Sequence, residues 1–405
     1  MKPELAPRSV SGAKELHIFL IAAEESGDRL GGSLMRALKE RTQGRIRFSG
    51  LGGEAMAAEG LVSLFPIAEL AIFGFTSIPA RLTSILRRIS QTTQAVLAAR
   101  PDVLVIIDSP DFTHRVARRV RAAEPSIPIV DYVSPSVWAW RPGRARAMRK
   151  YVDHVLALLP FEPAVHQRLG GPPCSYVGHP LIERVKELRP APGEPSRRES
   201  EPPVLLVLPG SRKGEIRRLL PIFERAVAIT ANERGALQVV MPTVPHLREA
   251  LVQGTAGWAV RPSIIVDAED KTTAFRNARA ALTKSGTVTL ELALAGIPMI
   301  AGYKFSRLEA WVARRLVSVP SAILANLVLA KNVVPEFIQE ACTADALAGA
   351  LTRLLADTPE RRQQIEAFSR LDEIMNIDAP APAMRAAEIV LSYARPDRCS
   401  PAVGA

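Results

Sequence analysis

One segment, residues 204–216, constrains the fold more than any other part of the chain. It begins with five consecutive apolar residues, most of them branched, a pattern typical of a strand covered on both faces. Pro209 and Gly210 end this run, and glycine lets the backbone turn and come close to a ligand. Ser211 can then cap a following helix, with Arg212 beside its free N–H groups. Such a turn favours a bound phosphate, although a capped turn with a solvated arginine has the same sequence.

The same alternation of apolar runs, turns and helical patterns recurs along the chain, which predicts an α/β protein with parallel sheets. The expected strands are residues 15–23, 46–50, 102–107, 127–133 and 154–159 in the first half, and 204–208, 237–241, 264–266, 280–283 and 299–301 in the second. The pattern then becomes helical over residues 308–317, 335–340, 344–355, 359–369 and 381–394.

The organisation expected from this pattern is two domains. Residues 189–203 are rich in proline and charge and have no apolar periodicity, which predicts a linker. We therefore expect an N-terminal Rossmann-like domain at 15–188 and a C-terminal one at 204–394, whose last helix can pack back on the first domain. Residues 1–14 and 395–405 are predicted to be loose tails.

Composition limits the classes of function. The chain has 405 residues, too many for one typical core, and 47% are hydrophobic. The formal net charge of +11 favours an anionic partner, which could be nucleic acid, a phosphorylated substrate or an acidic membrane. The three cysteines are far apart and the six histidines lack metal-ligand spacing, so we expect a reducing compartment without a disulfide framework or a zinc site. No apolar run has the roughly 18 residues that span a bilayer.

A second strand–glycine–helix turn lies at residues 283–291. Ser285, Thr287 and the amide of Gly286 could hold a phosphate or a sugar, and Glu291, about two turns into the helix, could reach a ribose. A capped helix without a ligand is the alternative. Two such turns in one half favour a nucleotide site there.

Polar groups also follow the expected strands of the first half. The turn after residues 15–23 holds Ser26, Gly27 and Asp28, but it lacks the Gly-x-Gly-x-x-Gly dinucleotide fingerprint. Asp108 follows the strand at 102–107, and parallel α/β sheets bind ligands at such strand ends. A proline-bearing loop at residues 134–140 carries two of the four tryptophans.

Two further segments have an ordinary and a functional interpretation. Residues 70–89 combine an apolar face with three arginines, which fits either a core helix after an irregular loop or a basic amphipathic contact with acyl chains or membrane. The apolar residues of this segment are Ile72, Phe73, Phe75, Leu82, Ile85, Leu86 and Ile89. Residues 141–150 contain five basic side chains, which suit a solvated helix face or a nucleic-acid contact.

Several segments together resemble one family, the lipid-A-disaccharide synthases, which are bacterial enzymes that join two acylated glucosamines. They are residues 24–31, 107–112, 132–141 (Tyr-Val-Ser-Pro-Ser-Val-Trp-Ala-Trp-Arg), 159–162, 177–180, 208–212 and 285–287, with Glu291. The string at 132–141 is the most specific. The chain departs from the family pattern at Ala23 and Glu25, where a glycine and a small residue are common. The resemblance implies a GT-B architecture, two Rossmann-like domains facing a cleft.

The resemblance also implies a reaction. UDP-2,3-diacylglucosamine donates its sugar to 2,3-diacylglucosamine 1-phosphate, giving a β-1,6-linked disaccharide 1-phosphate and UDP. The acceptor hydroxyl needs a base, for which Asp108 is the first candidate and Asp111 the second. Arg212, Ser211 and their helix N-terminus would stabilise the departing diphosphate. The sequence has no Asp-x-Asp pair, so no metal or other cofactor is expected.

The remaining implied contacts divide between the two substrates. The donor would contact Gly210, Ser211, Arg212, Ser285, Gly286, Thr287, Glu291 and Asn326. The acceptor or its sugar would contact Glu24, Ser26, Gly27, Asp28, Ser134, Trp138 and His179. The segment at 70–89 would contact acyl chains and anionic lipids on the cytoplasmic face of the bacterial inner membrane, and the family suggests a homodimer.

Two alternatives differ in class. A nucleotide-sugar epimerase shares this architecture, but it acts on a free UDP-sugar and has no use for the apolar surface at 70–89. A basic nucleic-acid-binding protein would depend on residues 141–150, but the sequence has no aromatic-interleaved platform or known binding motif, so no nucleic-acid partner is expected.

Overall fold

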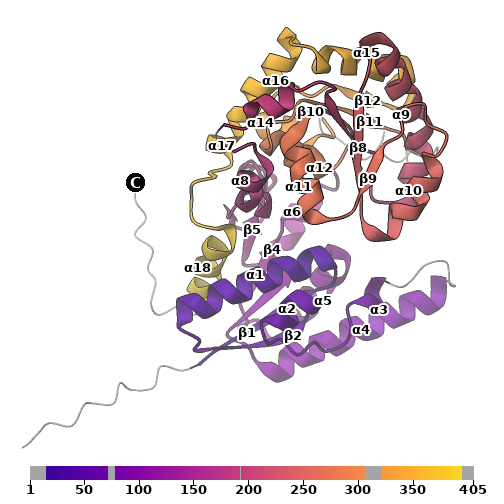
Figure 1. Cartoon of the computed structure of the whole chain (residues 1–405). Helices are drawn as coiled ribbons and strands as arrows, with labels where there is room; N and C mark the ends of the chain where they lie inside the picture. Colours follow the sequence, from indigo (N-terminus) through magenta and orange to yellow (C-terminus); the bar gives the residue numbers. More distant parts are fainter. Residues whose placement is uncertain (1–14, 72–77, 192, 306–320, 395–405) are drawn as a thin grey trace, which may run out of the picture.

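The computed structural model describes residues 15–71, 78–191, 193–305 and 321–394. They form two six-stranded sheets, with strand orders β2-β1-β3-β4-β5-β6 and β12-β11-β10-β7-β8-β9. Every pairing is parallel. The two sheets occupy separate halves of the molecule (Figure 1). The predicted α/β fold class is therefore confirmed.

The first sheet and its helices take up the N-terminal part of the chain. In chain order they are β1 (Leu16–Ala22), α1 (Glu25–Thr42), β2 (Ile46–Leu51), α2 (Glu54–Ala58), α3 (Ala68–Ala71), α4 (Ile78–Ala99), β3 (Val103–Ile107), α5 (Pro110–Ala123), β4 (Ile129–Tyr132), α6 (Gly143–Met148), β5 (His154–Ala157), α7 (Glu162–Leu169) and β6 (Cys174–Tyr176).

Two short helices, η1 (Pro180–Arg184) and α8 (Val185–Leu188), and then η2 (Pro195–Glu199) lead to the second sheet. Its elements are β7 (Val204–Leu208), α9 (Lys213–Arg234), β8 (Gln238–Pro242), η3 (Pro245–Leu247), α10 (Arg248–Gly254), β9 (Ser263–Ile265), α11 (Ala268–Asn277), β10 (Ala278–Lys284), α12 (Val288–Leu294), β11 (Met299–Tyr303), α14 (Leu324–Leu329), β12 (Glu336–Ile338), η4 (Gln339–Ala341), α15 (Ala344–Leu355), α16 (Pro359–Ser369), α17 (Leu371–Ile374) and α18 (Pro382–Ala394).

Helices cover both faces of each sheet, which explains the uninterrupted apolar runs in the sequence. All seven residues of β1 are buried. Its side chains alternate between faces, so Ile18 packs in a cluster with α1 and α18, while Phe19 packs in a second cluster with α4 and α5. The second sheet is arranged in the same way: Leu206 faces a cluster with α12, and Leu205 one with α9 and α15.

In each sheet the strand order reverses at one point, and polar turns lie there. In the first sheet β1 lies between β2 and β3, so the turns after β1 and β3 are neighbours. In the second, β7 lies between β10 and β8, so the turns after β7 and β10 are neighbours. Open α/β sheets bind ligands beyond the carboxyl ends of the strands at such reversals.

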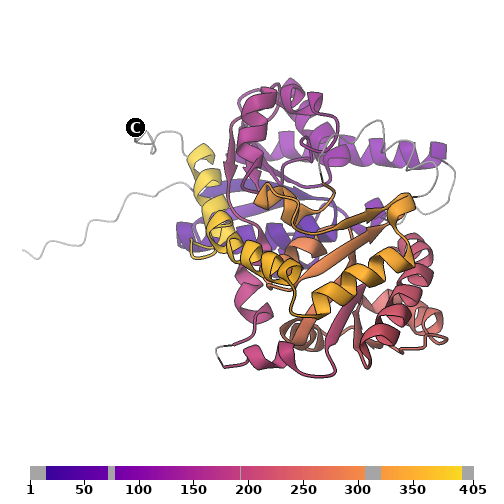
Figure 2. The ribbon, with the colours of Figure 1, turned by 90° about the horizontal axis from the view of Figure 1, so that it is seen from above.

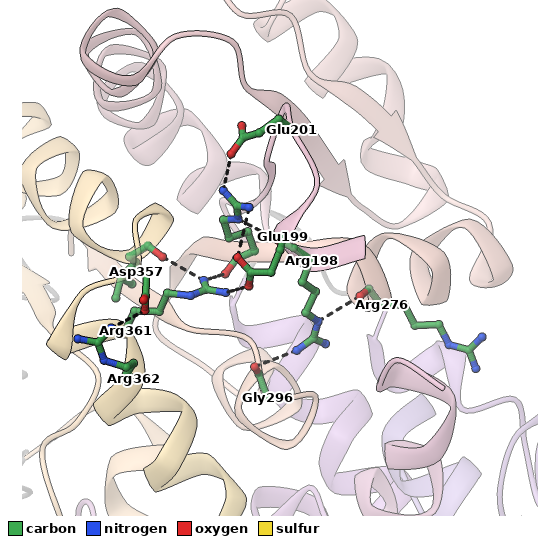
Figure 3. Close-up of polar contacts among 10 residues, drawn as sticks. Arg198, Glu199, Glu201, Arg276, Gly296, Asp357, Arg361 and Arg362 are labelled. Atoms are coloured by element: carbon green, nitrogen blue, oxygen red, sulfur yellow. Dashed lines mark hydrogen bonds and ion pairs between the residues drawn. The ribbon is translucent and has the colours of Figure 1, made fainter. Parts of the chain in front are cut away.

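The segment predicted as a linker is anchored to the second half of the molecule (Figure 3). The guanidinium of Arg198 donates to four backbone carbonyls at 2.9–3.2 Å, including that of Gly296. Arg361 donates to Glu199 at 2.8 Å. Residues 180–188 also pack against the second half, since Ile182 and Leu188 belong to its core cluster. We propose that the division between the halves lies near residues 177–180, before the predicted linker.

The chain passes between the two halves a second time near its C-terminal end. Tyr176 donates to the carbonyl of Met375 at 2.8 Å, which ties the two crossing segments together. Helix α18 then returns to the first half and packs on α1 (Figures 1 and 2), where Arg41 pairs with Glu388. Ala386 and Val390 are fully buried in the cluster that β1 and α1 form.

Some expected elements differ from the structure. The sequence missed β6, and it predicted a helix at 335–340 where β12 and η4 lie. Both missed strands have three residues and lie at sheet edges, so their apolar signal is weak. The expected helix at 308–317 and the predicted tails, 1–14 and 395–405, lie outside the described residues.

Candidate active site

A cavity of about 410 Å³ opens at the reversal point of the second sheet. Its walls come from the turn after β7, the turn after β8, helix α11 and the turn after β10. The lining residues are Leu208, Gly210, Ser211, Arg212, Pro242, Thr243, Val244, Lys271, Lys284, Gly286, Thr287 and Val288. Five of the eight predicted donor residues thus meet in one place: Gly210, Ser211, Arg212, Gly286 and Thr287.

The turn after β7 has the predicted shape with one difference. Gly210 has φ +126°, a conformation that strains other residues, so glycine is needed there. The helix cap is Arg212, and Ser211 is not the cap. Helix α9 begins one residue later than a Ser211 cap would require. The side chain of Arg212 is 83% exposed and lies 3.8 Å from Glu215, so it is available to an anion in the cavity.

The turn after β10 places its glycine and threonine at the cavity, but not its serine. Gly286 has φ +152° and lines the cavity with Thr287. Ser285 is not among the lining residues, and its hydroxyl donates weakly to the carbonyl of Ala322 at 3.4 Å. The predicted role of Ser285 as a donor contact is therefore not supported by this geometry.

Glu291 is buried beside the cavity and already paired. Lys271 donates to both of its carboxylate oxygens, at 2.9 and 3.2 Å, and Arg184 lies 3.7 Å away. A ribose hydroxyl could bind this carboxylate only by sharing it with Lys271 or displacing it.

Asn326 has a structural role in this conformation. Its side chain is 2% exposed. The amide oxygen accepts from the backbone of Val333 and Val334 at 3.0 and 2.9 Å, and the amide nitrogen donates to the carbonyl of Val334 at 3.0 Å. These bonds close the loop after α14 and leave little capacity for a donor molecule.

Asp108 and Ser26 meet at the reversal point of the first sheet. Ser26 Oγ donates to Asp108 Oδ2 at 3.2 Å, although the two residues are 82 positions apart. Asp108 and Ser109 both have positive φ, 53° and 45°, an unusual conformation that tends to occur at functional sites. Asp111 lies one helical turn away with a side chain that is 86% exposed and 3.5 Å from Arg144.

The other residues of the first turn separate into structural and accessible groups. Asp28 is 3% exposed, and its carboxylate accepts from the backbone N–H groups of Gly53, Ala55 and Met56 at 2.7–3.1 Å. The carboxylate therefore holds the start of α2. A Cβ on Gly27 would lie 3.2 Å from the carbonyl of Ile107, so glycine allows α1 to approach β3.

Glu24 is exposed and lines a second cavity, of about 560 Å³, above α1 and α2. Asp28 also contributes to its wall. Asp108 lines neither this cavity nor the one in the second half. Of the predicted acceptor residues in the first turn, Glu24 and Asp28 thus line this cavity, and Ser26 and Gly27 do not.

The tryptophan loop is held by a buried polar network. Trp138 Nε1 donates to Glu162 Oε1 at 3.1 Å, and the ring packs edge-on against Phe161. Ser134 Oγ lies 2.9 Å from His166 Nε2 and is buried. Burial raises the pKa of Glu162 to about 7. Ser134 and Trp138 therefore both contact protein atoms here, and of the two Ser134 is buried whereas Trp138 is partly exposed.

His179 is also structural. Its Nδ1 accepts from the backbone N–H of Leu181 at 3.1 Å and caps η1. Burial lowers the pKa of His179 to about 4, so the ring is neutral near pH 7. A neutral capping histidine can position the crossing segment but cannot supply a charge.

The predicted acyl-contact surface is described only in part. Ile72, Phe73 and Phe75 lie outside the described residues, as does the side chain of Leu82. Leu86 is 38% exposed, and Ile85 is partly buried against the core. The prediction is wrong for Ile89, which is fully buried against the first sheet and cannot reach a lipid.

The sequence analysis did not predict four charged residues around the cavity of the second half: Lys271, Lys284, Glu215 and Arg184. Lys284 had a usable signal, because it ends a buried strand directly before a glycine turn. Lys271 and Arg184 come from helices whose sequence gives no sign of their neighbours. No group of three or more His, Cys, Asp or Glu among the described residues is placed to hold a metal ion.

The comparison with known proteins decides the family. The model of the family described as lipid-A-disaccharide synthetase matches residues 18–389. A lipid-A-disaccharide synthase of Rhodopseudomonas palustris (strain HaA2) is 59% identical over 390 residues, which cover 96% of this chain and 99% of the relative. The chain belongs to the lipid-A-disaccharide synthase family. A more distant member, from Rhodospirillum centenum (strain ATCC 51521 / SW), is 44% identical over 383 residues, 94% of this chain and 95% of its own. The resemblance predicted from the sequence is confirmed.

Solved structures show how far this family shares its fold with others. MurG of Acinetobacter baumannii has a TM-score of 0.57 at 14% identity, covering 93% of this chain and 99% of its own. The S. aureus MnaA structure with UDP has a TM-score of 0.58 at 13% identity, covering 94% and 96%. Identities this low show the fold alone, and they confirm the two-domain GT-B architecture. Among the described residues, none of the helices combines the length and the apolar character needed to cross a membrane.

Proposed function

We propose that this protein transfers the sugar of UDP-2,3-diacylglucosamine to the 6-hydroxyl of 2,3-diacylglucosamine 1-phosphate. The products are the β-1,6-linked disaccharide 1-phosphate and UDP. Family membership over residues 18–389 is the observation that carries the proposal, and it makes the chain a glycosyltransferase of lipid A biosynthesis. The substrates themselves are inferred from the name of the relatives.

The donor is proposed to bind in the cavity at the second reversal point. Its diphosphate would lie at the start of α9, where free N–H groups and Arg212 favour an anion. Its ribose would reach Glu291 by competing with Lys271. The binding energy of the diphosphate is then mostly electrostatic, and Arg212→Ala should weaken UDP binding by about 1.5–3 kcal/mol, the range for a charge-assisted hydrogen bond.

Asp108 is the proposed base. In an inverting displacement the acceptor oxygen attacks the anomeric carbon as the bond to the diphosphate breaks, and the hydroxyl proton passes to a carboxylate. Asp108 is partly buried at a strand end, and its bonds from Ser26 Oγ and the Ser109 amide fix its direction. Asp111 is more exposed and is the second candidate. The 6-hydroxyl of the acceptor must then lie within hydrogen-bond reach of Asp108 and next to the anomeric carbon of the donor sugar.

The acylated substrates suggest a membrane surface. Leu86 and the neighbouring Arg87 are both exposed on α4, which supports a contact of this helix with lipid. The net charge of +11 favours anionic lipids and a phosphorylated acceptor. We propose peripheral binding to the inner face of the bacterial inner membrane, without a nucleic-acid partner. A homodimer is a further proposal that rests on the family alone.

Product analysis tests the function. Purified protein is incubated with radiolabelled UDP-2,3-diacylglucosamine, with and without 2,3-diacylglucosamine 1-phosphate. We expect disaccharide 1-phosphate and UDP in equal amounts, formed only when the acceptor is present. Consumption or epimerisation of the UDP-sugar without acceptor would instead indicate the epimerase alternative.

A further inference from the structure

Lys284 and Glu215 form a buried ion pair in the wall of the donor cavity. Lys284 is the last residue of β10, and its Nζ lies 3.0 Å from Glu215 Oε1 in the first turn of α9. The side chain of Lys284 is 18% exposed and that of Glu215 is 4% exposed. The pair thus joins the two elements whose turns build the cavity.

The two glycine turns lie directly along the lysine side chain. A Cβ on Gly286 would come within 3.3 Å of Lys284 Cε and 3.5 Å of its Nζ. A Cβ on Gly210 would come within 3.3 Å of Lys284 Cδ and 2.6 Å of Glu215 Oε2. The lysine side chain therefore passes close to both turns, with its Cδ near Gly210 and its Cε and Nζ near Gly286.

This ion pair would be unfavourable in free energy if its only role were to hold the fold together. Removing two charges from water costs several kcal/mol, and an apolar pair of similar volume is often as stable. Glu215 Oε2 is buried and has no hydrogen-bond partner among the described residues, so the carboxylate is only half satisfied. Lys284, in contrast, keeps a path to the cavity, because it is one of the lining residues.

We propose that Lys284 is a catalytic cation that stabilises the departing diphosphate, and that Glu215 is the residue that positions it. The inference rests on the proposed function of the same cavity. As the acceptor oxygen bonds to the anomeric carbon, the bond from that carbon to the phosphate oxygen breaks and its electron pair stays on UDP. The acceptor proton goes to Asp108. Lys284 keeps its own proton throughout and offsets the new negative charge.

Lys284 is better placed for this role than the other cations of the cavity. Arg212 is 83% exposed, so water screens its charge. Lys271 is bound by both carboxylate oxygens of Glu291. A fixed charge shielded from water interacts more strongly with charge that develops during a reaction.

The test compares variants that keep the site neutral. Lys284→Gln combined with Glu215→Gln avoids leaving an unpaired buried charge, and Lys284→Arg keeps the charge. Lys150→Gln, an exposed lysine in the first half, controls for loss of one surface charge. Each protein is measured for disaccharide turnover and, by calorimetry, for binding of UDP and of uridine, which lacks the phosphates.

We expect the neutral double variant to lose about 10²-fold in kcat and about tenfold in UDP affinity, with uridine affinity unchanged. Lys284→Arg should recover at least a tenth of wild-type kcat, and Lys150→Gln should match wild type. Turnover and UDP affinity within threefold of wild type in the double variant would overturn the inference, as would an equal loss for UDP and uridine.

The two proposals fail differently. If the wild-type protein forms no disaccharide, the proposed function is wrong, whatever the variants do. If wild type is active and the double variant keeps its turnover, only the role of Lys284 is wrong. If the double variant does not fold, the UDP and uridine titrations on Lys284→Gln alone decide by the same criterion.

Discussion

Arg198 offers the sharpest test of whether residues 195–199 belong to the second half, because it fixes them there without using apolar packing. Its guanidinium donates to the carbonyls of Phe275, Arg276, Ala295 and Gly296. A hydrogen bond to a charged group contributes about 1.5–3 kcal/mol, but four bonds to one half-buried group are not additive. Burial lowers the pKa of Arg198 to about 10, which leaves it charged at neutral pH.

We therefore expect Arg198→Met to lower the free energy of unfolding of the second half by about 3–4 kcal/mol. Methionine keeps most of the apolar stem, so the loss reports the guanidinium. For a unit of 150–250 residues, each kcal/mol lowers Tm by about 2–4 °C, which predicts a fall of roughly 6–16 °C. Differential scanning calorimetry on the full chain measures this, with UDP added to identify the transition of the donor half.

Arg197→Met is the matched control. Arg197 is the adjacent residue, its side chain is 59% exposed, and its nearest partner, Glu194, lies 3.9 Å away. We expect a change within about 0.5 kcal/mol. If Arg198→Met melts within 2 °C of Arg197→Met, the segment is a free linker and the anchoring argument fails.

Three further predictions follow from other parts of the molecule. Burial raises the pKa of Glu162 from 4.5 to about 7, so the folded state holds that proton more tightly and stability is lost as pH rises from 4.5 through 7. Glu162→Gln should escape this loss, gaining roughly 3 kcal/mol relative to wild type between pH 4.5 and 8; a constant difference in urea titrations would contradict it. Asp28→Ala should cost about 2–4 kcal/mol, measured by urea unfolding, because three backbone N–H donors at the start of α2 lose the carboxylate that accepts from them. The double variant Phe73→Ser with Phe75→Ser should keep the Tm of wild type but bind anionic vesicles more weakly. Its activity on acylated substrate should fall more than its affinity for UDP. A large fall in Tm with unchanged vesicle binding would show instead that this stretch belongs to the core.

The sheets could be predicted because buried parallel strands carry an uninterrupted branched apolar signal. The five-residue strand β7 was predicted with its correct bounds, and β1, β3 and β10 to within one or two residues at each end. The signal fails for short edge strands such as β6, whose three residues are only half buried. It also fails where arginines hold a segment by binding backbone carbonyls, because such anchoring leaves no apolar periodicity.

The sequence predicted those parts of the site that depend on backbone conformation. Glycine at positions 210 and 286 indicated turns that the structure places side by side. Polar side chains were harder to assign, because their partners come from distant parts of the chain. The sequence could not show that Asp28 caps α2, nor that the amide of Asn326 is used by its own loop. Lys271 and Glu215 were missed for the same reason.

The central claim is that the two reversal points act in one reaction, with a base in the first half and a donor cavity in the second. The most direct measurement tests the base. Asp108→Asn is assayed for disaccharide formation and for UDP affinity by calorimetry, with Asp111→Asn as the control. We predict that Asp108→Asn folds normally, binds UDP within threefold of wild type and loses at least ~10²-fold in turnover, the effect expected for loss of a general base. Near-normal turnover in Asp108→Asn, or an equal loss in Asp111→Asn, would contradict the assignment of the base to Asp108.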